Sequence, residues 1–231
     1  MMLSGGEWAI IGLSLKVAIA AVAVTLPIAY ALAWLLARRQ FRGKLLLDAA
    51  VHLPLVVPPV VTGWLLLVAF GRNGPVGRVL EDWFGVTLVF SWTGAALAAG
   101  VMALPLMVRA MRLSIEAVDR RLVDAARTLG SSPWAAFRRI TLPLSLPGIF
   151  AGIMLGFARA LGEFGATITF AANIPGQTRT LPLAIYTALQ SPGGEAMVTR
   201  LALVSVALSI IAIVASEYLV RRASGERAHA L

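Results

Sequence analysis

No charged residue interrupts the chain from Val17 to Ala37. A helix needs about 20 mostly apolar residues to cross the hydrocarbon core of a bilayer. Four further apolar stretches approach or reach that length, so we predict five transmembrane helices, at approximately 9–37, 49–70, 90–108, 144–164 and 201–220. The apolar stretch 181–189 is too short to cross and is interpreted as a re-entrant or interfacial helix.

The overall composition agrees with a membrane location. Hydrophobic residues make up 59% of the sequence and charged residues only 13%, against about 25% charged in typical soluble domains. A chain with so few charged residues has too little polar surface to cover itself in water. In lipid no such cover is needed, because helices satisfy their own backbone hydrogen bonds there. Residues 1–231 are therefore predicted to form a single all-α polytopic membrane domain.

The distribution of basic residues predicts the direction of the five helices. Of the 20 Lys and Arg residues, 14 lie between the first and second helices, between the third and fourth, or after the fifth, and 4 lie in the other connections. Such a bias marks the cytoplasmic side. The N-terminus is thus expected in the periplasm and the C-terminus in the cytoplasm, and topology explains the net charge of +9 without nucleic acid. The sequence has no cysteine and only two histidines, so no metal site is expected.

The connection at about 116–143 carries the most local structure. Leu122, Ala125, Ala126 and Leu129 have the spacing of one helical face. Gly130 is a helix stop, and Ser132-Pro133 is typical of the start of a second helix. This helical elbow has two interpretations: an amphipathic hairpin on the headgroups, or a projection that inserts into a cytoplasmic partner.

The same connection resembles the EAA loop of ABC-transporter permeases. Asp124-Ala125-Ala126, then Gly130, then Ile140 with Leu142-Pro143 match the family spacing, with Asp in place of the usual Glu. The resemblance implies that this segment docks into a groove of a separate ATPase subunit. The residues expected to couple the two subunits are Asp124, Ala125, Ala126, Leu129, Gly130, Ile140, Leu142 and Pro143.

Other segments resemble the molybdate and sulfate branch of these importers. They are 53–63 in the second helix, 158–166 in the fourth, and 173–180 after it. The resemblance implies a type I importer fold in the bacterial inner membrane, with molybdate as substrate and sulfate, thiosulfate or tungstate as alternatives. It further implies two cytoplasmic ATPase subunits and a periplasmic molybdate-binding protein. Two-fold assembly is common, so a homodimer of the permease is expected.

No Walker motif occurs in the sequence, so ATP and magnesium are expected in the partner ATPase and no cofactor in this chain. No catalytic residue is assigned. An intramembrane enzyme that uses Glu163 would lack a nucleophile or a second carboxylate. A proton-coupled carrier would transport without any ATPase, which separates it from an importer.

The candidate substrate pathway is predicted around Arg159 and Glu163 and the nearby Gly162 and Gly165. The two charged residues are four apart on one helix face, and charges at depth need partners. The pair either locks the fourth helix as a simple ion pair, or lines and gates an oxyanion path, with the glycines permitting a bend.

Pro54, Pro58 and Pro59 lie within the second predicted helix. Each proline removes a backbone donor and disturbs the helix. Broken helices at membrane depth are buried or line a cavity. We favour a bend at Pro58 and Pro59 that lines the pathway over a purely structural one. The outer segment 173–200 is either a gate or docking surface, or an ordinary connection.

Overall fold

The computed structural model describes residues 3–228, with side chains described to residue 215 and at Tyr218. Every element of the described part is a helix. In chain order they are α1 (Gly5–Arg38), α2 (Lys44–Val56), α3 (Pro59–Phe70), α4 (Pro75–Phe84), α5 (Trp92–Glu116), α6 (Arg120–Thr128), α7 (Pro133–Ala136), a π-helical turn (Phe137–Thr141), α8 (Leu142–Leu161), α9 (Gly165–Phe170), α10 (Leu181–Leu189) and α11 (Glu195–Ala228).

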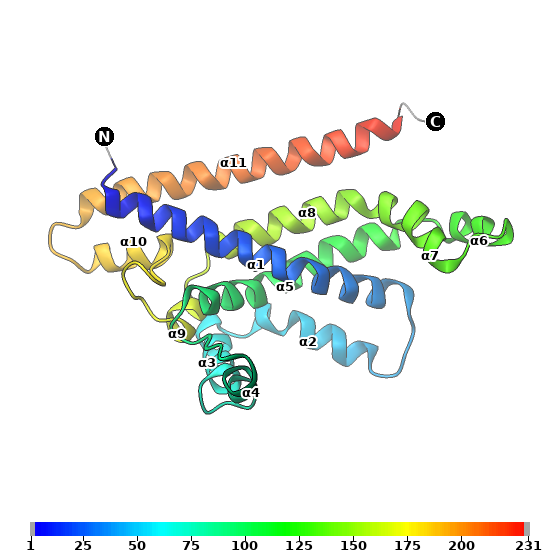
Figure 1. Cartoon of the computed structure of the whole chain (residues 1–231). Coiled ribbons are helices and arrows are strands. Elements are labelled where there is room, and N and C mark those ends of the chain that lie inside the picture. The colour runs from blue at the N-terminus through cyan, green and yellow to red at the C-terminus, as the bar shows by residue number, and fades with distance from the viewer. Residues whose placement is uncertain (1–2, 229–231) are drawn as a thin grey trace.

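Long helices run side by side and give the molecule its elongated shape (Figure 1). Four helical segments are long and apolar enough to cross a membrane: α1, α5, the continuous stretch from α7 through α8, and α11. The pair α2 and α3 supplies a fifth if it is counted as one broken span. The described N- and C-terminal residues lie at opposite ends of this bundle, as an odd number of crossings requires (Figure 1).

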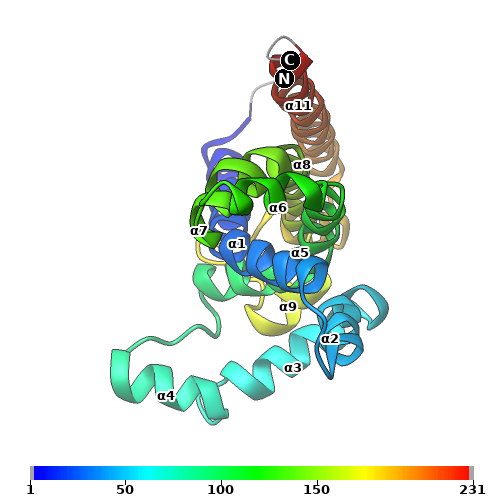
Figure 2. The ribbon, with the colours of Figure 1, turned by 90° about the vertical axis from the view of Figure 1, so that its right-hand side faces the viewer.

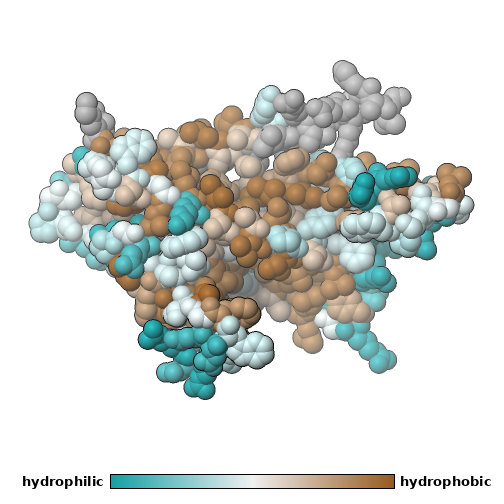
Figure 3. Space-filling model, in the orientation of Figure 1, coloured by the Kyte–Doolittle hydropathy of each residue, from teal (hydrophilic) through white to brown (hydrophobic). Residues whose placement is uncertain are grey.

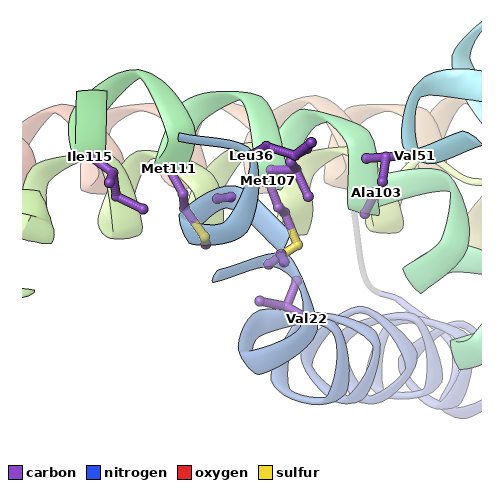
Figure 4. Packing of buried hydrophobic residues seen from close by; sticks show 10 residues of the cluster. Val22, Leu36, Val51, Ala103, Met107, Met111 and Ile115 are labelled. Atoms are coloured by element: carbon purple, nitrogen blue, oxygen red, sulfur yellow. The ribbon is translucent and has the colours of Figure 1, made fainter. Parts of the chain in front are cut away.

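The core forms where α1, α5 and α8 meet. Met107 and Met111 of α5 are fully buried there, beside Leu36 of α1 (Figure 4). Gly152 and Gly156 of α8 lie against these two methionines, so closely that a Cβ at Gly156 would come within 2.6 Å of the Met107 sulfur. Small residues at one-turn spacing let membrane helices approach closely, and this spacing on α8 sets its distance from α5.

Apolar residues cover the middle of the molecule. Figure 3 shows them across the centre of one face, with hydrophilic residues gathered toward the two ends and the lower edge. Exposed Ile210, Ile211, Ile213 and Val214 make α11 apolar on its open side. In water such a surface would be unfavourable, whereas lipid tails match it.

Several predicted helix boundaries differ from the structure, most of all in the second, third and fourth spans. The second predicted span, 49–70, is two helices bent by 118° between Val56 and Pro59. Two consecutive prolines cause this break, because Pro59 has no N–H to continue the helix. The third predicted span, 90–108, begins instead at Trp92, where Ser91 Oγ accepts the Gly94 N–H at 3.1 Å, and continues to Glu116.

The fourth predicted span is displaced in the same way. It starts earlier than Leu144, because α7, the π-helical turn and α8 form one helix of 29 residues from Pro133 to Leu161. It also ends earlier than Phe164, since the helix stops at Leu161 and Gly162. Arg159 and Glu163 therefore lie at the end of this span, beside the turn that leads to α9.

Ion pairs and hydrogen bonds hold together the end of α1, the start of α2 and the end of α5, next to the connections that are rich in basic residues. Arg112 of α5 contacts both carboxylate oxygens of Asp48 on α2, at 3.1 and 3.2 Å, and its Nε donates to Glu116 at 2.8 Å. Arg38, at the end of α1, donates to the backbone carbonyls of Ile115 and Val118. The Arg38 bond to Ile115 thus supplies a donor to the last turn of α5.

The opposite end of the bundle has its own fastenings. Arg200 of α11 pairs with the buried Glu7 of α1 at 2.8 Å. The hydroxyl of Ser14 accepts the N–H of Leu181 at 2.7 Å and thereby ties the start of α10 to α1. The apolar stretch 181–189 is therefore a short helix as predicted, and it packs between α1 and α11.

Candidate functional site: a projecting helix and two broken spans

The connection between α5 and α8 folds as its residues predict. Asp119 caps α6 by accepting the Arg121 N–H at 2.9 Å. Gly130 ends the helix with a φ of +88°, a conformation that favours glycine. Ser132 then caps α7 by accepting the Ala135 N–H at 3.2 Å. The first predicted short helix and the start of a second at Pro133 are confirmed, but the second is not short, because it continues without a break into α8.

Helix α6 stands away from the bundle. It extends beyond the ends of the long helices (Figure 1), and no residue of it is buried. Leu129 is 88% exposed and Leu122 50% exposed, and Trp134 of α7 is 67% exposed. Side chains of this kind are normally covered, so a contiguous exposed apolar group indicates a surface that awaits a partner.

The predicted coupling residues divide between two sides of α6. At about 100° per residue, Leu122, Ala125, Ala126 and Leu129 fall on one side of the helix. Asp124 falls on the other side, where it lines a groove against the end of α1. Asp124 belongs to the same sequence motif as Ala125 and Ala126, and the helical spacing places it on the other face, as the structure has it.

Ile140, Leu142 and Pro143 lie where the connection joins α8. Ile140 belongs to the π-helical turn, and Leu142 and Pro143 begin α8. A proline within a helix clashes with the carbonyl four residues before it. The wider π-helical turn directly ahead accommodates Pro143 and keeps the helix continuous. Ile140, Leu142 and Pro143 thus join the projecting helices to the membrane helix and are not themselves part of the projecting face.

The breaks in the second and fourth spans pack against each other. A Cβ added at Gly165, the first residue of α9, would lie 2.8 Å from Cβ of Pro59, the first residue of α3. One turn further on, a Cβ at Gly63 of α3 would lie 2.7 Å from the Ala166 carbonyl oxygen. Only glycine allows the two backbones to approach so closely. Pro58, Pro59 and Gly165 were predicted separately, and the structure brings them together.

The charged pair lies beside this contact. Arg159 Nη1 is 2.6 Å from Glu163 Oε2, and the Arg159 side chain is 25% exposed whereas that of Glu163 is 2% exposed. The other oxygen of Glu163 accepts the Ala166 N–H at 2.7 Å, so the carboxylate also caps the start of α9. Gly162 ends α8 and lines a cavity of about 430 Å³ between α8, α10 and α11. The Glu163 carboxylate therefore links the end of α8, through Arg159, to the start of α9, through Ala166.

Several functional contacts were missing from the sequence analysis. Arg38 and Arg112 were counted only as basic residues of connections, and Gly63 was not singled out. Their partners lie far away in the chain: Arg38 contacts Ile115, and Arg112 contacts Asp48. A pattern of neighbouring residues in the sequence cannot predict contacts between residues so far apart in the chain. The only signal for Gly63 was its place one turn after the Pro58-Pro59 break.

The fold is that of an ABC-importer transmembrane subunit. A solved bacterial ABC transporter that imports the acidic polysaccharide alginate superposes with a TM-score of 0.74 at 17% identity, over 95% of this chain and 80% of that one.

The sequence matches the family described as "Binding-protein-dependent transport system inner membrane component" over residues 12–225. The chain therefore belongs to this family.

Among curated relatives, the molybdenum transport system permease protein ModB of Escherichia coli K12 is 58% identical over 99% of both chains. The protein of the same name in Haemophilus influenzae is 56% identical over 94% of both chains. A sulfate transport system permease, CysW of Synechococcus elongatus, is 36% identical over 82% of this chain and 70% of that relative. The projecting helix and the broken spans thus occur in a permease whose relatives are named for molybdenum and sulfate transport.

Proposed function

We propose that this chain is the permease subunit of a molybdate importer in the bacterial inner membrane. Two copies surround one pathway, two ATPase subunits bind at the cytoplasmic face, and a periplasmic protein delivers the anion. The observation that carries the proposal is the exposed apolar side of α6, beside an identity of 58% to a molybdenum permease over nearly the full chain. The sulfate relative is less similar, at 36%, which favours molybdate.

The proposed mechanism is alternating access driven by a separate ATPase, which binds ATP and magnesium. Closure of the ATPase subunits moves α6, and the helix from Pro133 to Leu161 carries that motion to the break at Gly162. The break meets α3 through Gly165 and Pro59, so the two broken spans move together. Arg159 at this point attracts the oxyanion, and Glu163 weakens its hold, because a path that binds tightly cannot turn over.

A second copy of the chain is proposed to pack on the exposed side of α2 and α3. Val56 is 82% exposed, Val60 54% and Trp64 54%, which is a continuous apolar surface around the elbow. Broken helices are tolerated at membrane depth where protein or a water-filled cavity covers them. A two-fold partner would cover this elbow and place two Arg159 side chains around one central path.

The function is tested by uptake in proteoliposomes that contain the permease, its ATPase and its binding protein. We expect ATP-dependent accumulation of labelled molybdate that exceeds that of sulfate. Omission of the ATPase serves as the control. Uptake that persists without the ATPase under a proton gradient would establish a carrier instead, and faster sulfate uptake would replace the substrate.

Orientation is tested with single thiols, because the sequence contains no cysteine. Ser131→Cys lies beside the projecting helix, and Gln190→Cys lies after α10 at the other end. In intact cells an impermeant maleimide is expected to label Gln190→Cys, and to label Ser131→Cys only after permeabilisation. The reverse pattern would place α6 in the periplasm and exclude a cytoplasmic ATPase as its partner.

A further inference from the structure

A groove of about 350 Å³ lies between the end of α1 and the inner side of α6, and it has an excess of positive charge. Figure 2 views this end of the molecule, where α1, α6 and α7 gather. Arg38 and Arg39 line the groove from α1, and Arg120 and Arg127 line it from α6. Asp124 is the one acidic residue among its lining residues. We call this feature the arginine groove.

The arginine groove is not neutralised by the protein. Arg38 is committed to the backbone carbonyls of Ile115 and Val118, and Arg39 lies over the ring of Trp34 at 5.6 Å. Arg120, Arg127 and Asp124 make no ion pair within 4.0 Å in the part of the chain that the structure describes. Four guanidinium groups thus face one carboxylate, and an anion would relieve their repulsion.

The groove is on the opposite side of α6 from the exposed apolar side chains. Arg120, Val123, Asp124 and Arg127 follow one another at i, i+3, i+4 and i+7 and form the inner side of the helix. An ATPase that covers Leu122, Ala126 and Leu129 would therefore leave the groove open to the membrane side. The two surfaces of this helix can be occupied at the same time.

The location selects the kind of anion. Arg38 and Arg39 come directly after the apolar part of α1, and Trp34 lies one turn before them. Trp residues and basic residues at a helix end occupy the headgroup region. Basic pockets at the cytoplasmic ends of membrane helices attract anionic lipid headgroups.

We propose that the arginine groove binds the phosphate of an anionic phospholipid of the cytoplasmic leaflet, and that this headgroup joins α6 to α1. The inference rests on the proposed orientation, in which this end of the bundle faces the cytoplasm. A lipid held here would fix the base of the projecting helix against the membrane while its outer side engages the ATPase.

The experiment measures binding of fluorescent phosphatidylglycerol and phosphatidylcholine to the purified full complex in detergent. Arg120→Gln with Arg127→Gln is expected to weaken phosphatidylglycerol binding by about thirtyfold, with little change for phosphatidylcholine. The matched control is Arg138→Gln with Arg139→Gln, which removes the same charge from exposed residues outside the groove. Asp124→Asn is expected to strengthen phosphatidylglycerol binding, a gain that misfolding cannot imitate.

Three results would overturn the proposal: equal loss in the control variant, equal binding of the two lipids, or displacement of phosphatidylglycerol by inorganic phosphate or molybdate. The last result would assign the groove to a soluble oxyanion. Lipid binding is measured without transport, so its result is independent of the uptake test. Failure of molybdate uptake with intact phosphatidylglycerol binding would count against the proposed function alone.

Discussion

Ala126→Asp is expected to release the ATPase from the purified complex and to abolish ATP-dependent uptake. The substitution places a charge at the centre of the exposed apolar side of α6, between Leu122 and Leu129. Central apolar contacts of an interface each contribute about 2 kcal/mol or more, and a carboxylate buried there without a partner adds a desolvation cost. We therefore expect at least about a thirtyfold weaker association, measured by titration of the ATPase onto reconstituted permease.

The matched control is Ala117→Asp, the same substitution at an exposed position between α5 and α6. It is expected to bind the ATPase normally, since surface substitutions away from a contact have little effect. An Ala126→Asp complex that retains its ATPase at wild-type affinity would contradict the coupling role of α6. Equal loss in the control would instead point to a general effect of charge at this end of the molecule.

Arg159→Ala is expected to destabilise the permease and to stop uptake. Glu163 is 3% exposed, and its carboxylate would lose the guanidinium that lies 2.6 Å from it. Breaking a buried pair from one side costs about 3–5 kcal/mol, and the partial exposure of Arg159 places the expected loss near about 3 kcal/mol. Thermal unfolding of the purified complex measures this loss, and labelled molybdate uptake measures the function.

A double variant separates the two roles of the pair. Arg159→Gln with Glu163→Gln removes both charges and keeps an oxygen for the Ala166 N–H, so stability should return. If Arg159 attracts the oxyanion, uptake stays below about one tenth of wild type, a loss of about 1.4 kcal/mol. Recovery of uptake together with stability would show that the pair only locks the break in span 4.

Another ion pair with a buried carboxylate provides the control. Arg200 and Glu7 have nearly the same geometry, at 2.8 Å, with side-chain exposures of 26% and 2%, but they lie at the outer end of α1 and α11. Arg200→Gln with Glu7→Gln is expected to retain uptake. A loss of uptake in this variant equal to that at Arg159 would remove the reason to assign a pathway role to either pair.

Local chemistry made the projecting helices predictable from the sequence. Asp119, Gly130 and Ser132 act on backbone groups within three residues of themselves, so their roles can be read without knowing the fold. The long apolar helices are predictable for a similar reason, because a bilayer imposes their length. Boundaries shifted at Ser91, which caps the start of α5, and at Pro143, where the π-helical turn lets the helix continue through a proline.

Contacts between distant segments could not be predicted in this way. Pro58 and Pro59 predicted that the second span is broken. The angle of 118° between α2 and α3 and the contact of Pro59 with Gly165 do not follow from the local sequence. What lies opposite Asp124 depended on where α1 ends, and the partner of Arg112 depended on α2. Such pairings arise from tertiary packing, which short-range patterns do not encode.

The unbroken helix from Pro133 to Leu161 has a mechanical consequence. Its 29 residues extend about 43 Å at ~1.5 Å per residue, and a hydrogen-bonded rod of that length barely shortens under load. A displacement applied at its Pro133 end therefore arrives at Gly162 as a tilt or a slide. In the proposed importer, the turn at Gly162 would therefore move with each nucleotide cycle of the ATPase.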